Sequence, residues 1–172
     1  MHFEKVSLEQ FTKDYLKCKY GNSDRTIDGD EAQEIIHIYD SISLPKRSTK
    51  GSAGYDFFIP YEQFFSNLNE TLIPTGIRFN CDEDKYLMCV PRSGLGFKYS
   101  MRLSNTCGII DSDYFYSDNE GHIMCKVECK YNFTLEQGKA FMQGIISQYF
   151  KVDGDDSDEI RNGGFGSTGM WV

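Results

Sequence analysis

One aspartate in this sequence has the surroundings that a general base needs. Asp111 follows two isoleucines in the stretch GIIDSDY (residues 108–114), so we expect an apolar strand to hold its carboxylate in a partly desolvated place. A carboxylate held beside a water molecule can take up a proton during hydrolysis. Aspartate after a strand is also a common turn residue, so the stretch alone leaves both interpretations open.

Two further stretches could bind an anion such as a phosphate group. PRSGLGFK (residues 91–98) places two cations and a serine after an apolar strand, although a β-turn with solvated cations has the same composition. GGFGSTG (residues 163–169) offers unobstructed backbone N–H groups and two hydroxyls, but it has no P-loop pattern and a disordered tail is its simplest alternative. Phe165 favours a binding role, because a ring on a glycine-rich arm can stack on a base.

Short apolar runs separated by turn residues must position these groups. Alternating or continuously apolar patterns typical of strands occur at residues 36–39, 75–80, 86–90, 122–129 and 144–150. The 11 tyrosines and 13 phenylalanines fit strand usage. The pattern predicts an all-β sandwich or barrel.

The first part of the chain differs from the rest. A capping-box pattern, SLEQ (residues 7–10), and Gly21 delimit one short amphipathic helix, and the polar, acidic residues 24–34 resemble a linker. Near the other end, residues 153–159 form a charged stretch that predicts a flexible tether. We therefore predict an N-terminal extension at 1–34, a β core at 35–152, and a tether with a glycine-rich, mobile arm at 153–172.

Composition excludes several classes of function. The 172 residues suit one domain, and a net charge of -8 argues against binding to a nucleic-acid backbone. No apolar run approaches the ~18 residues that span a membrane. The six cysteines form no C-x-x-C pair and the three histidines give a zinc site little material, so we predict reduced thiols and a cytoplasmic protein (host cytoplasm if the source is viral).

Five stretches in order resemble the motifs of trimeric dUTP pyrophosphatases (dUTPases), and the resemblance covers about residues 35–169. The motifs are AGYDF (53–57), PRSG (91–94), GIIDSDY (108–114), GKAFMQ (138–143) and GFGSTG (164–169). The resemblance implies a distorted, jelly-roll-type β-barrel that assembles as a homotrimer with active sites at subunit contacts. It also implies hydrolysis of dUTP to dUMP and pyrophosphate with Mg²⁺.

The same resemblance implies a role for each matching residue. Asp111 would activate the water that attacks the α-phosphorus, and Asp56 would hold water bound to Mg²⁺. The phosphate contacts would come from Arg92, Ser93, Gly94 and Gln143. The uracil contacts would come from the Asn105 amide and the backbone around Gly108, Ile109, Ile110 and Met124.

The resemblance also implies how other nucleotides are refused. Cytosine inverts the donor and acceptor at the base edge and would leave buried groups unpaired. Tyr114 would pack on the deoxyribose and leave no space for a 2′-hydroxyl. On closure of the arm, Phe165 would stack on uracil, and the phosphates would be covered by Gly166, Ser167 and Thr168.

The sequence departs from the family pattern in three places. The fifth-motif arginine is expected at position 160, but isoleucine stands there and Arg161 follows; we expect Arg161 to reach the γ-phosphate. Residues 115–120 form an insertion, expected as a hairpin, after the third motif, and the N-terminal extension lies outside the match. Either segment could contact a protein partner.

Two alternatives remain open at this point. dCTP deaminases, alone or bifunctional, share the fold and use a glutamate on the strand after the third motif; Glu128 lies on that strand but out of register. A nucleotide-sensing, protein-binding module could also keep the same fold.

Overall fold

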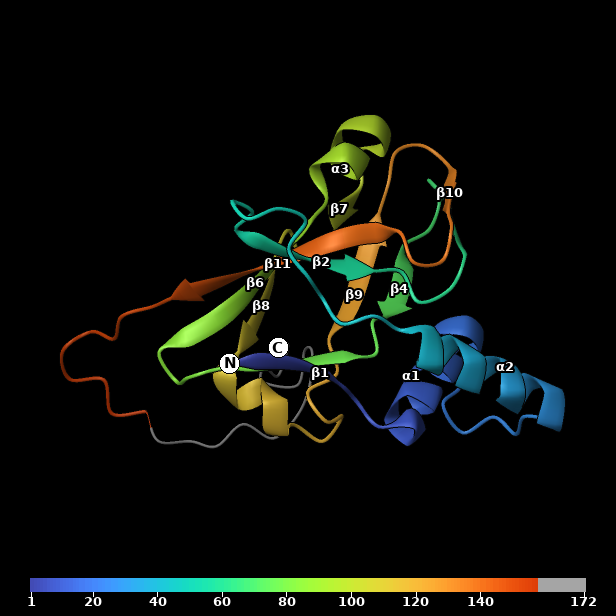
Figure 1. Ribbon diagram of the computed structural model, residues 1–172, viewed down its shortest axis with the longest axis horizontal. Coiled ribbons are helices and arrows are strands. Elements are labelled where there is room, and N and C mark those ends of the chain that lie inside the picture. The colour runs from blue at the N-terminus through green and yellow to red at the C-terminus, as the bar shows by residue number, and fades with distance from the viewer. Residues whose placement is uncertain (158–172) are drawn as a thin grey trace, which may run out of the picture.

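The computed structural model describes residues 1–157 of the chain (Figure 1). Strands dominate it, with three α-helices and one short 3₁₀ helix in the described range. The strands are β1 His2–Lys5, β2 Gly54–Phe58, β3 Gln63–Phe65, β4 Thr71–Pro74, β5 Ile77–Asn80, β6 Lys85–Pro91, β7 Arg102–Leu103, β8 Gly108–Asp111, β9 Met124–Glu128, β10 Phe133–Leu135 and β11 Ala140–Gln148. The helices are α1 Leu8–Tyr20, α2 Gly29–Ser41, α3 Ser93–Tyr99 and η1 Ser112–Tyr116. The predicted all-β class is confirmed.

Two sheets carry most of the architecture, and every strand pair is antiparallel. One has the order β2-β11-β6-β8 and the other the order β4-β9-β7, while β1 pairs with β5 and β10 with β3. Neighbouring strands are mostly distant in sequence, as in the predicted jelly-roll type. Among residues 1–157 the sheets stay separate and do not close into a barrel.

Strand β11 pairs with β6, and β6 pairs with β8, so the packing of β11 against the core also positions β6 and β8. A Cβ on Gly144 would lie 2.8 Å from the Leu87 side chain and 3.0 Å from that of Phe57, so a glycine lets β11 pack closely against buried side chains. In β5, Ile77 and Phe79 are buried while Arg78 is only half-buried. The alternating pattern at 75–80 therefore predicted the correct buried face.

The predicted N-terminal helix is confirmed at both ends. The Ser7 hydroxyl accepts the Gln10 N–H at the start of α1, and Gly21 ends the helix in the left-handed conformation at φ 72°. Phe11 and Tyr15 are buried, and α1 lies against β4, beside α2 at one side of the β core (Figure 1). Within residues 1–157, no helix is long and apolar enough to span a bilayer.

The predicted linker at 24–34 and strand at 36–39 were wrong, because helix α2 occupies Gly29–Ser41. Asp28 caps the helix by accepting the Glu31 N–H. Ile35, Ile38 and Ile42 are buried, a spacing of three and four residues that matches one helical face. A four-residue alternation is too short to outweigh that longer periodicity.

Two local segments take structures that the sequence did not indicate. The stretch after β6, for which a β-turn was one open interpretation, forms the helix α3, whose large aromatic Phe97 is 93% exposed. The insertion at 115–120 is not a hairpin: it continues η1 and then turns through Glu120 and Gly121, both at positive φ. A Cβ on Gly121 would lie 2.7 Å from the Phe115 Cα, so this tight turn requires glycine.

Candidate active site

A cavity of about 790 Å³ lies beside β8 and β9. Its wall includes four of the residues predicted to contact uracil: Asn105, Gly108, Ile110 and Met124. The wall also contains residues that the sequence did not single out: Asp14 and Lys17 from α1, and Asn119 from the insertion. The structure thus brings together four of the five predicted base-binding residues, with an added wall from the N-terminal helix, while Ile109 is not part of the wall.

The turn between β7 and β8 brings backbone groups to this cavity. Thr106 takes a left-handed conformation at φ 70°, and the Cys107 N–H donates to the Asn105 carbonyl at 2.8 Å. The Asn105 side chain stays exposed. A Cβ on Gly108 would lie 3.3 Å from the Cys89 Cβ, so glycine allows β8 to sit close to β6. The arrangement presents an amide and a tight backbone turn to a planar ligand.

Asp111 is the last residue of β8 and the first residue before η1. It pairs with Tyr86 of β6 and is half-buried. Of the two isoleucines before it, Ile110 is buried while Ile109 is 46% exposed. The strand therefore fixes the Asp111 backbone next to Ile110, which lines the cavity.

Tyr114 lies behind the cavity wall. Only 4% of it is exposed, and its hydroxyl donates to the His122 carbonyl at 2.8 Å. The Asn119 amide donates to the same hydroxyl at 2.8 Å, and Asn119 is the residue that lines the cavity. In the described part of the chain Tyr114 supports the wall, and its contact with a sugar stays a prediction.

A second cluster of predicted residues lies at the end of β6 that is far from Asp111. Arg92 donates to one carboxylate oxygen of Asp56, and the Ser48 hydroxyl donates to the other. Asp56 is only 5% exposed, so these partners stabilise a buried charge. Gln143 of β11 pairs in register with Asp56 and packs over Gly54, where a Cβ would lie 2.4 Å from the Gln143 side-chain oxygen.

Ser93 and Gly94 open helix α3 immediately after Arg92. Both are exposed, and a Cβ on Gly94 would meet no atom within 4 Å. The Arg92 N–H donates to the Phe141 carbonyl of β11 at 3.0 Å, which fixes where the helix starts. The predicted phosphate contacts Arg92, Ser93, Gly94 and Gln143 are therefore neighbours around the ends of β6 and β11.

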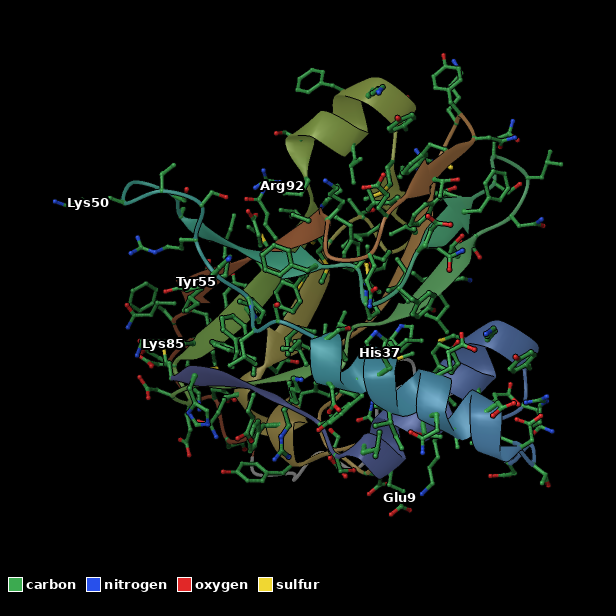
Figure 2. The ribbon with its side chains drawn as sticks, turned by 45° about the vertical axis from the view of Figure 1, so that its right-hand side comes forward. Glu9, His37, Lys50, Tyr55, Lys85 and Arg92 are labelled. Atoms are coloured by element: carbon green, nitrogen blue, oxygen red, sulfur yellow. The ribbon has the colours of Figure 1, made fainter. Side chains whose placement is uncertain are left out.

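Asp111 and the Arg92 cluster lie far apart in one chain. Asp111 pairs with Tyr86, which precedes Arg92 by six positions along β6. At about 3.3 Å per residue, this separates Asp111 from Arg92 by ~20 Å. Figure 2 shows Arg92 near the base of α3 and Lys85, the first residue of β6, at the opposite end of the strand. One chain alone does not bring Asp111 and Ser93 to the same phosphorus atom.

Burial lowers the reactivity of the two thiols that line the cavity, Cys89 and Cys125. It raises the pKa of Cys89 to about 12 and raises the pKa of Cys125 well above its ordinary value. Because the thiolate is the nucleophilic form, both cysteines are unreactive near neutral pH. Neither can serve as a covalent catalyst, and a carboxylate-assisted reaction suits the site better.

Comparison with known proteins assigns the chain to a family. The family model for dUTPase matches residues 40–169. The chain belongs to the dUTPase family. It is 38% identical over 146 residues to the deoxyuridine 5′-triphosphate nucleotidohydrolase of Lactococcus lactis subsp. lactis (strain IL1403), a match that covers 79% of this chain and 95% of the relative. The relative from Finegoldia magna is 36% identical over 135 residues, covering 73% and 91%.

Solved structures agree with this assignment. The crystal structure of dUTPase from Streptococcus mutans superposes with a TM-score of 0.60 at 32% identity, covering 64% of this chain and 89% of that chain. A dUTPase from phage phi11 of S. aureus, at 17% identity, covers 68% of this chain and 90% of that one with a TM-score of 0.56, and so supports the fold alone. As a dUTPase, the protein is a hydrolase of nucleotide metabolism.

The structure weakens the deaminase alternative. Glu128 ends β9, four residues beyond Met124, and accepts a hydrogen bond from Arg102 at 2.8 Å. It does not contribute to the wall of the cavity that contains Asn105. This glutamate is therefore not placed to carry protons to a base held there.

Five predicted substrate contacts lie outside the described residues. They are Arg161, Phe165, Gly166, Ser167 and Thr168. Their roles stay predictions from the fifth motif.

The donor set fits a magnesium ion carried mainly by the substrate. Residues 1–157 contain no group of three or more His, Cys, Asp or Glu side chains that could hold a metal. Asp56 already accepts hydrogen bonds from Arg92 and Ser48, and its remaining lone pairs can accept from a metal-bound water. Mg²⁺ commonly keeps several waters and binds substrate phosphates, which suits such an outer contact.

Proposed function

We propose that this dUTPase hydrolyses dUTP to dUMP and pyrophosphate, with Asp111 as the general base. The observation that carries the proposal is the position of Asp111 at the end of β8, the strand that begins at Gly108 after the turn that brings Asn105 to the cavity. A nucleotide whose base enters this cavity would have its sugar and α-phosphate close to the end of β8. The six cysteines are unpaired, which supports action in the reducing cytoplasm.

In the proposed reaction, Asp111 takes a proton from the attacking water. The water oxygen forms a bond to the α-phosphorus while the bond from that phosphorus to the oxygen bridging to the β-phosphate breaks, so pyrophosphate leaves with the bonding electrons. Such a base contributes roughly 10²–10⁴-fold to the rate. The rest of the catalysis comes from positioning and charge stabilisation, as in other phosphoryl transfers.

Base selection would rest on the turn at Asn105. Its amide can donate to the uracil O4 and accept from N3–H, while the backbone around Gly108 and Ile110 adds further polar contacts. Cytosine would face these groups with the wrong donor and acceptor, and a site built for specific hydrogen bonds can reject such an analogue by about 10⁴–10⁵.

The phosphate chain would be held by the Arg92 cluster of a neighbouring subunit. Arg92 uses one guanidinium nitrogen on Asp56, and its other donors remain for a phosphate. Ser93 and Gln143 would add neutral donors. Mg²⁺, when bound to the triphosphate, supplies charge neutralisation, and Asp56 would hold one of its waters.

We further propose a homotrimer, because Asp111 and Arg92 lie ~20 Å apart in one chain, as the register of β8 on β6 indicates. An oligomer can place β8 of one subunit against the α3 end of another. Asp111 of one subunit and the Arg92 cluster of another would then face one substrate across the contact.

Release of pyrophosphate from dUTP, dTTP, dCTP and UTP, each with and without Mg²⁺, tests the function. We expect rapid release from dUTP with Mg²⁺ and release at least about 100-fold slower from the other three nucleotides. Ammonia release from dCTP would instead support a deaminase, and equal rates on dUTP and dCTP would contradict the role of Asn105.

A further inference from the structure

The N-terminal extension and the insertion at 115–120, which both lie outside the family pattern, are joined by hydrogen bonds. The Ser7 backbone N–H and hydroxyl both donate to the Glu120 carboxylate, at 2.7 and 2.6 Å. Ser7 is also the residue that caps helix α1. The carboxylate of the insertion thus holds the start of the N-terminal helix, 113 positions away in the sequence.

The backbone at Glu120 is conformationally strained, so the contact with Ser7 forms at an energetic cost. Glu120 has φ 58°, in the left-handed region that favours glycine or asparagine. A glycine at this position would relieve the strain but would remove both hydrogen bonds to Ser7. The side chain is therefore the physical reason for a glutamate there.

A second contact joins the same segments in the interior. His122 is completely buried, and its Nε2 accepts the Gly76 N–H at 2.8 Å. The ring proton must then be on Nδ1, which donates to the Asp14 carboxylate of α1 at 2.6 Å. The Gln10 amide also donates to Asp14, at 2.7 Å. Helix α1 therefore fixes the orientation of the His122 ring.

A third contact lies on the outer side of the insertion. Arg78 of β5 pairs with Glu4 of β1 at 2.7 Å and stacks over the Phe115 ring, with 4.3 Å from the guanidinium carbon to the ring centroid. His2 of β1 meets the same ring edge-on. The insertion is thus held by both β1 and α1.

These contacts reach the proposed sugar side of the cavity through two residues. The His122 carbonyl accepts from the Tyr114 hydroxyl at 2.8 Å and from the Asn119 amide at 3.3 Å. Asn119 and Asp14 both line the cavity. A shift of His122 or Glu120 would therefore move Tyr114 and Asn119 together.

We propose that the N-terminal segment, residues 2–20, is a positioning element of the active site. Through Glu120 and the Asp14–His122 pair it fixes Tyr114 and Asn119, and so sets how closely the site fits the sugar of its nucleotide. This inference rests on the proposed dUTP hydrolysis. It assigns Glu120 and Asp14 as positioning residues that control discrimination between deoxyribose and ribose.

The test compares kcat/KM for dUTP and for UTP in the full chain carrying Glu120→Gly. Glycine suits the left-handed backbone, so we expect the variant to fold with little change in Tm. We expect the dUTP-to-UTP ratio to fall at least about tenfold, since displacement of a positioning group by ~1 Å can cost up to about 10²-fold. Because an unfolded fraction lowers both rates equally, the ratio reports positioning and not stability.

Matched variants complete the experiment. Asp14→Asn keeps an oxygen that accepts from His122 and should keep the ratio, whereas Asp14→Leu removes that acceptor and should lower it. Glu9→Ala, on the solvent side of α1, should leave the ratio unchanged (Figure 2 shows Glu9 pointing away from the core). An unchanged ratio in Glu120→Gly and Asp14→Leu would overturn this inference alone. Failure of the unmodified protein to hydrolyse dUTP would overturn the proposed function and the inference with it.

Discussion

Subunit complementation tests the proposed geometry most directly. Asp111→Asn removes the base, and Ser93→Glu places a carboxylate where a phosphate would bind; Ser93 is exposed, so the fold should tolerate the change. Each variant alone should be inactive, since like-charge contacts cost several kcal/mol and the base contributes at least about 100-fold. Mixed trimers, made by co-expression or by refolding together, should regain activity.

The size of the recovery depends on whether one subunit or two supply Asp111 and Ser93 to a site. If each site takes Asp111 from one subunit and Ser93 from another, random 1:1 trimers have an intact pair at one half times one half of the contacts, about one quarter of sites. If one subunit supplied both residues, no site would be intact. Pyrophosphate release by the mixture, compared with the unmodified protein, measures this fraction.

A matched control distinguishes a site shared between two subunits from a site within one subunit. The double variant, with both changes in one chain, is mixed 1:1 with the unmodified protein. Sites shared between subunits again give about one quarter of full activity, whereas sites within one subunit give about one half. No recovery with the single variants, together with one half in this control, would refute the shared site.

Three further predictions concern individual residues. Asp111→Asn should still bind dUTP, measured by calorimetry, while kcat falls at least about 100-fold; near-normal turnover would remove Asp111 from its role. Cys89 and Cys125 should resist alkylation at pH 8 in the folded protein and react once it is unfolded, as peptide mass spectrometry would show, because burial raises the pKa of both thiols. Although burial opposes it, hydrogen bonds from His122 and Gln10 lower the pKa of Asp14 below its ordinary 3.8. Its carboxylate therefore stabilises the fold above about pH 4, and this contribution is lost as pH falls through the folded pKa; Tm should fall less steeply below pH 4 in Asp14→Asn, and an identical slope would contradict the shift.

Local sequence signals predicted the elements that depend on near neighbours. The cap at Ser7 and the stop at Gly21 involve bonds within four residues, and both are present. Strand β6 was predicted from its apolar run and its terminal proline. Helix α2 was missed because the isoleucines that it buries could also be counted as an alternating strand over a short window.

The wall of the candidate site illustrates what local patterns leave out. Gly108 was found because it belongs to the compact motif that contains Asp111, and Asn105 because the resemblance to dUTPases implies an asparagine six residues before that aspartate. Asp14 was missed, since it contacts His122 across 108 positions and belongs to a helix whose sequence shows only an ordinary polar face. The same holds for Glu120, whose carboxylate looks like a solvated charge until its contact with Ser7 is seen.

The charges around the two clusters indicate how an acidic protein can accept a triphosphate. Arg92 is paired with Asp56, and Lys126, which lines the cavity, is paired with Glu70. Lys17 is the cavity-lining cation without an ion pair in the described part of the chain. At a net charge of -8, the protein as a whole repels a tetra-anion, and these ion pairs neutralise part of the local positive charge. A nucleotide that arrives with its own divalent cation brings the compensating charge, which fits a site whose carboxylate Asp56 is buried and already paired.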